Sequence, residues 1–402
     1  MKIVFLAPFG IRPKGTVVAR MLPLAVELQR LGREVVIVAP PYTNPEDSGK
    51  TEILRGVRLV NVRLPVGGKA LGAPLLAWRL LKASLAERPD IVHLFKPKGY
   101  GGLAAMLMLW FGRVGIRMPR FFLDTDDWEG RGGMNDLHQY STAEKRLYAF
   151  QEQWLPRRAV GVTVASRMLE GAIRDMGVEA RRLLYLPNGV EDSALGDGAK
   201  ARQRWGIPPE VPVLLLYTRF FEFSQEKLHR VFAEVHRRVP QARLLVVGKG
   251  RQNEEEELEL AARREGFAEA LILAGWVEVA DLPDYLAAGD VAIYPFADTL
   301  LNRAKCPAKL TELLRSRVPV VADAVGQIEE YIESGATGLL CPPDDWQDMV
   351  DKTVEMLENS QLRRQFGVAG RQRLLDRFNW QNLAGALDSF YRELTGNANP
   401  GS

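Results

Sequence analysis

Residues 301–321, LNRAKCPAKLTELLRSRVPVV, place three cations around the start of a predicted helix. Arg303 and Lys305 come before Pro307, and Lys309 comes after it. Proline is favoured in the first turn of a helix, where a missing N–H group costs no hydrogen bond. The N–H groups and dipole of a helix N-terminus attract anions, and nearby Arg and Lys add positive charge. The stretch therefore predicts either a phosphate site or an ordinary surface helix with solvated cations.

Charged loops also follow predicted buried strands in the first half of the chain. Arg12 and Lys14 follow the strand at residues 2–8, and Lys96 and Lys98 follow the strand at 90–95. An acidic loop, DTDDWE, follows the strand at 120–123. Ligands of α/β sheets bind at the carboxyl ends of parallel strands. The basic pairs predict a site for an anionic substrate, with solvated loops as the alternative.

The elements that position these loops form two similar halves. Each half alternates short apolar strands with amphipathic helices, as in βαβ units. The first strand–loop–helix lacks the GxGxxG spacing of dinucleotide-binding loops. We expect an α/β fold with two Rossmann-like domains, residues 1–190 and 191–379, facing each other across a cleft. The polar, Gly- and Ala-rich segment 191–201 suits a linker between them.

Composition narrows the class of protein. The chain has 402 residues, which is long for a single core and suits two domains. Its net charge is only +3, so nucleic acid is not an expected partner. Two cysteines and the absence of a signal-peptide pattern favour the cytoplasm. The apolar stretches 74–88 and 103–111 are too short to span a membrane; they either pack internally or rest on the inner face of a bilayer.

Several motifs in the second half occur in a familiar order. They are VVGKG, GWV, DLPDYLAAGDVAIYP, KLTELLRSRVPVVADAVGQIEEYI and GATGLLCPPDD, with PNGV before them. This arrangement resembles the GT-B fold glycosyltransferases of family 4 over nearly the whole chain. The resemblance implies retaining transfer of a sugar from a nucleotide-diphosphate donor, with no metal or other cofactor. It also implies that the last helix, about 380–396, returns to the first domain.

The resemblance assigns roles to particular residues. Glu312 matches the second glutamate of the family's paired motif and would bind the ribose hydroxyls of the donor. Arg219 would contact the diphosphate, and together with Lys305, Lys309 and Asp126 it makes up the expected catalytic set. The other donor-binding candidates are Gly15, Lys227, Gly248, Gly250, Gly275, Trp276, Val277, Arg303, Cys306, Pro307, Ala308 and Leu310. The acceptor-binding candidates are Arg12, Lys14, His93, Lys96, Lys98 and Asp127, although His93 is equally well explained as a core histidine.

Three departures from the family pattern matter for the mechanism. Ala304 stands where the first glutamate of the pair is usual, and Lys227 comes late for the phosphate-binding lysine. Asp126 stands where relatives have a histidine. A front-face mechanism tolerates this loss, because the departing phosphate can accept the acceptor's proton. Asp126 would then orient the acceptor hydroxyl or the donor sugar.

Two other functions are compatible with the sequence. One is a nucleotide-sugar 2-epimerase of the same fold, and the other is an inactive nucleotide-sugar-binding protein. DTDD also resembles the metal-binding Asp-x-Asp motif of single-domain transferases, but the two-domain layout argues against that class. We expect a nucleotide-diphosphate sugar as the donor and an unidentified acceptor, anionic or lipid-linked, in glycan or glycolipid synthesis.

Overall fold

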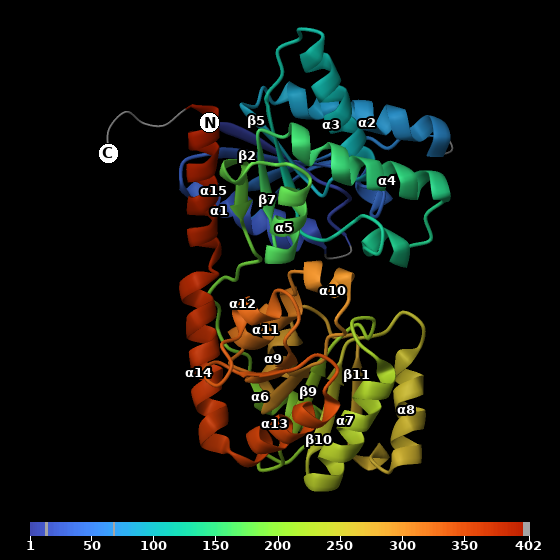
Figure 1. Ribbon diagram of the computed structural model, residues 1–402, viewed down its shortest axis with the longest axis vertical. Helices are drawn as coiled ribbons and strands as arrows, with labels where there is room; N and C mark the ends of the chain where they lie inside the picture. Colours follow the sequence, from blue (N-terminus) through green and yellow to red (C-terminus); the bar gives the residue numbers. More distant parts are fainter. Residues whose placement is uncertain (13–14, 67–68, 397–402) are drawn as a thin grey trace. The chain divides into compact units, whose positions relative to one another are not determined.

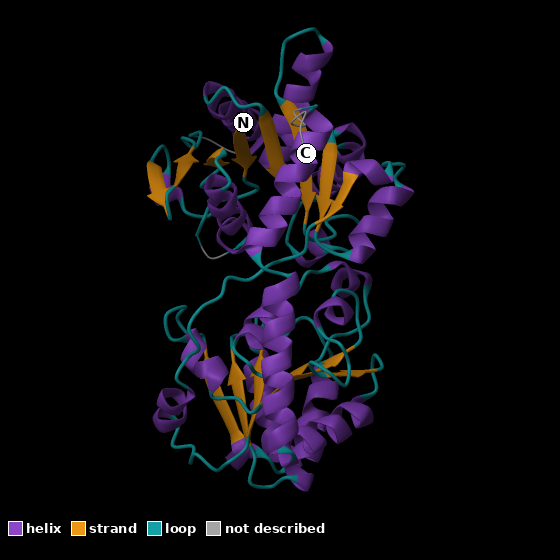
Figure 2. Cartoon of the chain, turned by 90° about the vertical axis from the view of Figure 1, so that its left-hand side faces the viewer, coloured by secondary structure: helices purple, strands orange, loops and turns teal. Residues whose placement is uncertain are grey.

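The computed structural model describes residues 1–12, 15–66 and 69–396 and divides into two compact units (Figure 1). The first unit consists of Met1–Gly189, Ala304–Cys306 and Trp380–Ser402. The second consists of Val190–Arg303 and Pro307–Asn379. Each unit has its own sheet with helices on both faces (Figure 2). The predicted α/β class with two parallel-sheet domains is confirmed.

The first unit is built on an eight-stranded sheet in the order β3-β4-β2-β1-β5-β6-β7-β8. The pair β3 and β4 is antiparallel, and the other neighbouring pairs are parallel. The strands are β1 (Lys2–Leu6), β2 (Glu34–Ala39), β3 (Thr51–Leu54), β4 (Val57–Asn61), β5 (Ile91–Phe95), β6 (Arg120–Thr125), β7 (Gly161–Val164) and β8 (Leu183–Tyr185). The hairpin partner β3 was not predicted from the sequence.

Alternate residues of β1 bury into two different core layers, as the period of a strand requires. Ile3 and Phe5 face the layer that includes α1 and α15, whereas Val4 and Leu6 face the layer that includes α2, α3 and α5. The helices of this unit are the π-helical turn η1 (Val17–Met21), α1 (Leu22–Arg30), α2 (Lys69–Ala86), α3 (Gly99–Arg113), α4 (Thr142–Trp154), α5 (Arg167–Asp175) and α15 (Trp380–Thr395).

The last helix, α15, packs beside α1 on the first sheet (Figure 1). Trp380, Leu387 and Tyr391 are buried in the core layer that β1 and α1 share. The amphipathic pattern of this segment gives it one apolar face, and that face completes the core of the first unit. The expected return of the chain terminus to the first domain is therefore observed.

The second unit has a six-stranded sheet, parallel throughout, in the order β11-β10-β9-β12-β13-β14. Its strands are β9 (Val213–Tyr217), β10 (Arg243–Val247), β11 (Leu271–Gly275), β12 (Val291–Tyr294), β13 (Val320–Asp323) and β14 (Leu339–Cys341). Its helices are α6 (Gly198–Arg204), α7 (Gln225–Arg238), α8 (Glu254–Glu265), α9 (Leu282–Ala287), α10 (Leu300–Ala304), α11 (Ala308–Arg315), α12 (Ile328–Tyr331), α13 (Trp346–Glu358) and α14 (Ser360–Arg377).

Helix boundaries follow local chemistry. Ser224 caps α7 by accepting a hydrogen bond from the Lys227 N–H, as its side chain predicts. Helix α2 begins five residues before Pro74, earlier than predicted, so this proline lies inside the helix. Short 3-10 turns occur at η2 (Pro45–Asp47), η3 (Met134–Leu137), η4 (Pro156–Arg158), η5 (Ala180–Arg182) and η6 (Ala268–Ala270). Over the described residues, we find no helix with the length and apolar character needed to cross a membrane.

Candidate functional site

A small cavity opens in the second unit at the carboxyl ends of β9 and β12. Parallel strands end together there, and α11 supplies a further wall. The lining combines an acidic, a basic and several aromatic side chains. The lining residues are Leu216, Tyr217, Thr218, Glu222, Phe223, Tyr294, Pro295, Phe296 and Lys309.

Glu312 lies next to this cavity and is held by Tyr217. The Tyr217 hydroxyl donates to Oε2 of Glu312 at 2.9 Å. Burial and the Glu312 charge raise the pKa of Tyr217 well above its usual range, so its hydroxyl stays a donor. One turn earlier on α11, the Lys309 ammonium lies 4.0 Å from a carboxylate oxygen of Glu222 and 5.7 Å from the Tyr217 ring centre. The helix thus presents a carboxylate and an ammonium group side by side.

Gly248 and Gly275 bring two loops into close approach. The Gly248 N–H donates to the Gly275 carbonyl at 2.8 Å, and both residues have positive φ, +124° and +66°. A Cβ atom on Gly248 would lie 1.9 Å from the Thr218 carbonyl oxygen. Only glycine fits there, because both the backbone conformation and the space exclude a side chain. Trp276 and Val277 follow Gly275, and the Trp276 side chain is largely exposed.

Gly250 already has a partner for its backbone N–H. That group donates to Oε1 of Glu255 at 2.8 Å, and the Gln252 N–H donates to Glu254. Both glutamates belong to the first turn of α8, where carboxylates are favoured by the helix dipole. A phosphate at Gly250 would have to displace Glu255.

Lys227 is engaged inside the second unit. Its ammonium lies 2.7 and 2.8 Å from the two carboxylate oxygens of Asp323, which also accepts from the Phe296 N–H at 2.9 Å. Burial raises the pKa of Asp323, and the nearby Lys227 opposes that rise. In this structure Lys227 therefore ties α7 to the end of β13, whereas the sequence predicted a phosphate contact.

The residues at and before the start of α11 are placed differently from what the sequence predicted. Pro307 was expected just inside the helix but is its N-cap, so the helix begins one residue later, and Ala308 and Leu310 lie in its first turn. Arg303 pairs with Asp298, with one contact of 2.6 Å. The segment Ala304–Cys306 belongs to the first unit, where the Ala304 carbonyl and Cys306 accept hydrogen bonds.

The predicted cation clamp is consequently divided. Arg219 is exposed in the loop after β9, and Lys309 lines the cavity of the same unit. Lys305 is buried and belongs to the first unit. The structure brings Arg219 and Lys309 into one unit with Glu312.

Lys96 and Lys98 lie in a buried ion-pair network of the first unit. The Lys96 ammonium is 2.8 Å from Asp126 and 3.3 Å from Glu129, and it also pairs with Asp127. Lys98 lies 2.7 Å from the second oxygen of Glu129. The sequence predicted that these lysines bind an anionic substrate; in this structure carboxylates of the acidic loop neutralise both of them.

The same network sets the charge of the acidic loop. Burial alone would raise the pKa of Asp126, but Lys96 and Arg20 hold it below its usual range. Burial raises the pKa of Asp127, and the neighbouring carboxylates add to the effect of burial. Asp126 is therefore ionised at neutral pH, and it also accepts from the Thr16 hydroxyl at 3.2 Å.

His93 is a core histidine. Its Nδ1 lies 2.5 Å from the Tyr391 hydroxyl of α15, and Nε2 lies 3.4 Å from the Thr163 hydroxyl. Burial, reinforced by the Arg20 charge, lowers the pKa of His93 to about 3. The structure favours the core-histidine interpretation of His93 over acceptor binding, since the ring is fully buried and bonded to internal groups.

Arg12 and its neighbours complete the first-unit candidates. Arg12 pairs with Asp47 and lies 3.5 Å from Glu52, so its charge is shared with carboxylates of the β3 region. Lys14 lies outside the described residues. Gly15 begins the turn that leads into η1, and its carbonyl accepts from the Val18 N–H at 3.0 Å.

Sequence reasoning missed the buried pair of Arg20 and Asp124. The guanidinium makes two contacts with the carboxylate, at 2.6 and 2.8 Å, and also donates to the Leu186 carbonyl at 2.7 Å. Asp124 accepts a further bond from Thr163. The available clue was an arginine between apolar residues near the start of a predicted helix. Its partner is 104 residues away, so spacing alone does not pair them.

Over the ranges that the structure describes, no group of three or more His, Cys, Asp or Glu side chains is arranged to hold a metal ion. The polar side chains at the cavity of the second unit are hydroxyl groups, the Glu222 carboxylate and the Lys309 ammonium, with Glu312 beside them. Such a set suits hydroxyl groups and phosphate oxygens.

Comparison with known proteins agrees with this geometry. A family described as "Glycosyl transferase 4-like domain" matches residues 15–189, and one described as "Glycosyl transferases group 1" matches residues 212–359. The glycogen synthase of Mycobacterium tuberculosis is 23% identical over 393 residues, covering 92% of this chain and 88% of that protein. The phosphatidyl-myo-inositol mannosyltransferase of Mycolicibacterium smegmatis is 23% identical over 402 residues, covering 98% and 95%.

Solved structures share the fold. Sucrose-phosphate synthase from Thermosynechococcus elongatus has a TM-score of 0.76 and 20% identity, covering 99% of this chain and 100% of that one. Anabaena HepE in complex with UDP and glucose has a TM-score of 0.72 and 18% identity, covering 98% and 100%. Fold and site together define a GT-B glycosyltransferase. More particularly, the two matched domains show that the chain belongs to family 4 of these enzymes.

Proposed function

We propose that this enzyme transfers a hexose, with retention of anomeric configuration, from a nucleotide-diphosphate sugar to a hydroxyl-bearing acceptor. The donor is assigned to the second unit. The observation that carries this assignment is the Tyr217–Glu312 pair beside Lys309, at the carboxyl ends of β9 and β12. A fixed carboxylate suits two vicinal ribose hydroxyls, and a nearby ammonium suits a phosphate.

The proposed chemistry uses the donor's own phosphate. The acceptor hydroxyl oxygen attacks the anomeric carbon on the face from which the nucleoside diphosphate departs. The bond between that carbon and the β-phosphate oxygen breaks, and the electron pair stays on the phosphate. The departing phosphate takes the hydroxyl proton. Arg219 and Lys309 stabilise the charge that develops on it, in the way an oxyanion hole stabilises acyl transfer.

Asp126 of the first unit is proposed to orient the acceptor. Its carboxylate is ionised and positioned by Thr16 and Lys96, so it can accept a hydrogen bond from an incoming hydroxyl. Because the lysines of this region pair with carboxylates, the acceptor site is not strongly basic. We therefore favour an acceptor recognised through hydroxyl groups, including a lipid-linked one, over an acceptor recognised through a phosphate at Lys96 and Lys98.

The donor is identified with a panel of UDP-, GDP-, ADP- and dTDP-sugars. A ligand bound only by the folded protein raises the melting temperature, and at a fixed ligand concentration the rise is larger for tighter binding. We expect one nucleotide series to raise it, release of nucleoside diphosphate to follow, and a chelator to leave that release unchanged. NMR of the glycosylated product should show the anomeric configuration of the donor.

Other outcomes point to other functions. An inverted product would reject the front-face mechanism. An isomerised free sugar would indicate a 2-epimerase, an alternative that none of the relatives quoted above supports. Binding without turnover, over a broad set of acceptors, would indicate an inactive binding protein.

A further inference from the structure

The outer surface of α2 and α3 carries large apolar side chains that the core does not use. These helices pack against each other on one face of the first sheet (Figure 1). Trp110 and Val114 are 56% and 57% exposed, although most tryptophans and valines lie inside proteins. The exposed members of the patch, called the α2–α3 patch below, are Leu75, Trp78, Trp110, Val114 and Ile116.

The patch is continuous across the two helices. The ring centres of Trp78 on α2 and Phe111 on α3 lie 6.0 Å apart, and those of Trp110 and Phe111 lie 5.0 Å apart. Val114 and Ile116 follow in the loop directly after α3. An apolar ridge of this kind on a protein surface marks an interaction site.

The charged residues of the two segments that form the α2–α3 patch are all basic. Residues 69–86 and 99–119 contain five basic residues and no aspartate or glutamate, whereas the whole chain has 53 basic and 50 acidic residues. Lys82, Arg113 and Arg117 are exposed beside the ridge. The chain as a whole has nearly equal numbers of basic and acidic residues, but these two segments carry only basic ones.

We propose that the α2–α3 patch docks on the surface of a bilayer that contains anionic lipid. Tryptophan is favoured at the boundary between headgroups and acyl chains, and branched apolar side chains insert below it. Lysine and arginine next to that boundary are attracted to anionic headgroups, and their long stems lie along apolar surface. Both features occur here on the same two helices.

The charge pattern also argues against a second copy of the chain as the occupant. A two-fold interface would place the patch against itself and bring Arg113 and Arg117 near the same cations of the partner. A bilayer offers both the apolar layer and the negative charge that the patch lacks. This inference does not depend on the proposed donor or acceptor, because the patch shares no residue with either candidate site.

Vesicle flotation with the full chain tests the proposal. We expect the protein to float with phosphatidylcholine vesicles that contain phosphatidylglycerol, and to remain unbound with phosphatidylcholine alone. Binding should weaken as salt rises, because screening reduces the attraction between the arginines and the headgroups. No flotation with the anionic vesicles at low salt would overturn the proposal.

Two sets of variants separate the apolar contribution to vesicle binding from the electrostatic contribution. Changing Trp110 and Val114 to Ser should reduce the partition coefficient about tenfold or more, because inserted apolar area is lost. Arg113→Glu with Arg117→Glu should have an effect of about the same size and should abolish the preference for anionic vesicles. The matched controls are Leu260→Ser and Val368→Ser, which change exposed apolar residues of α8 and α14 in the second unit. They should bind as the unchanged chain does.

Circular dichroism and thermal unfolding, measured on every variant, show whether the protein is folded. Unchanged unfolding with lost flotation supports the docking surface. Flotation that neither set of variants alters would overturn the proposal. So would a concentration-dependent dimer in sedimentation that the Trp110 and Val114 changes abolish, since the patch would then join two copies of the chain. Failure of the proposed transfer reaction would leave flotation unaffected, so the two hypotheses fail separately.

Discussion

The two α/β units use the charged loops at the ends of their strands in opposite ways. In the first unit, Lys96 and Lys98 are buried and saturated by carboxylates. In the second, Arg219 is exposed, and the Lys309 ammonium lies 4.0 Å from a carboxylate oxygen of Glu222. Cations near the ends of parallel strands are thus held in a buried network in the first unit, whereas Arg219 of the second unit is exposed to solvent. A cation is available to a phosphate only where the fold has not already neutralised it.

The largest expected effect is on the stability of the first unit. Lys96→Met would leave Asp126, Asp127 and Glu129 without their shared cation in a buried setting. Breaking a buried pair by removing one partner costs about 3–5 kcal/mol. We expect a loss of that order in the free energy of unfolding, measured by urea denaturation and circular dichroism.

Lys309→Met is the matched control, because it removes a lysine from the first turn of α11 in the second unit. Its side chain is 20% exposed and its ion pair is long, so we expect a loss of about 1 kcal/mol or less. Equal losses for Lys96→Met and Lys309→Met would contradict the contrast drawn between the units.

The next largest effect is on turnover. Arg219→Ala removes an exposed cation assigned to the departing diphosphate, and loss of one anion-stabilising group lowers kcat by about 10²–10³-fold. Steady-state release of nucleoside diphosphate measures it. Arg230→Ala, which removes an exposed arginine from α7, should leave kcat within a factor of about two. If Arg219→Ala retained normal turnover, the exposed Arg219 of the second unit would have no role in catalysis.

A smaller effect is expected on donor affinity, and it should come from a change at Glu312. Glu312→Ala removes a carboxylate assigned to two ribose hydroxyls, and hydrogen bonds to a charged group contribute about 1.5–3 kcal/mol. We expect the donor Kd, measured by calorimetry, to rise about 10- to 100-fold. Tyr217→Phe should raise it only several-fold, because the carboxylate remains but loses its support.

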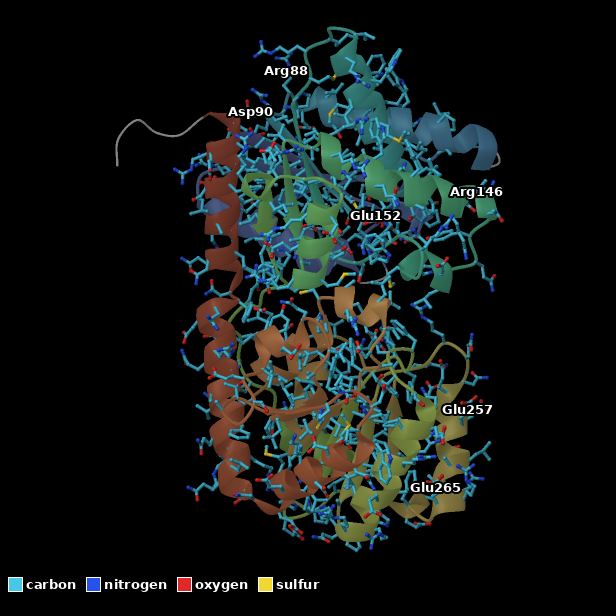
Figure 3. All side chains as sticks on the ribbon, in the orientation of Figure 1. Arg88, Asp90, Arg146, Glu152, Glu257 and Glu265 are labelled. Atoms are coloured by element: carbon cyan, nitrogen blue, oxygen red, sulfur yellow. The ribbon has the colours of Figure 1, made fainter. Side chains whose placement is uncertain are left out.

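Glu257→Ala provides the control for Glu312→Ala. Glu257 lies on the outer edge of α8 in the same unit and is exposed (Figure 3). Its removal should leave the donor Kd unchanged. An unchanged Kd for Glu312→Ala as well would remove the ribose assignment.

The sequence predicted the fold better than it predicted the electrostatics. Strand and helix patterns are local properties, so both units could be derived from them, and the family resemblance added the expected return of α15. Whether Lys96 faces solvent depends on the direction of carboxylates about thirty residues away, which no local pattern encodes. The pairing of Arg20 with Asp124 and the burial of His93 against Tyr391 are long-range contacts for the same reason. Single-residue features such as the Ser224 cap were predictable because both partners lie within one turn.

The smallest expected effect concerns the excess acid of the first unit, where buried carboxylates outnumber the lysines that neutralise them. Glu152 is fully buried in the interior of this unit (Figure 3). Burial, and then the charge of Glu129, raise the pKa of Glu152 well above its ordinary value of 4.5. The folded state therefore holds a proton that the unfolded state releases above that pH, so stability falls as the pH rises from about 4.5 toward the folded pKa.

Glu152→Gln removes this dependence while keeping the shape of the side chain. Each unit of pKa elevation corresponds to about 1.4 kcal/mol, so the variant should be more stable than the unchanged chain at pH 8 and similar to it near pH 4. Thermal unfolding between pH 4 and 8 measures the difference, and Glu257→Gln, at an exposed position, should leave the profile unchanged. A Glu152→Gln profile parallel to that of the unchanged chain would mean that Glu152 is ionised, and that the lysines of the network balance one more carboxylate than their ion pairs indicate.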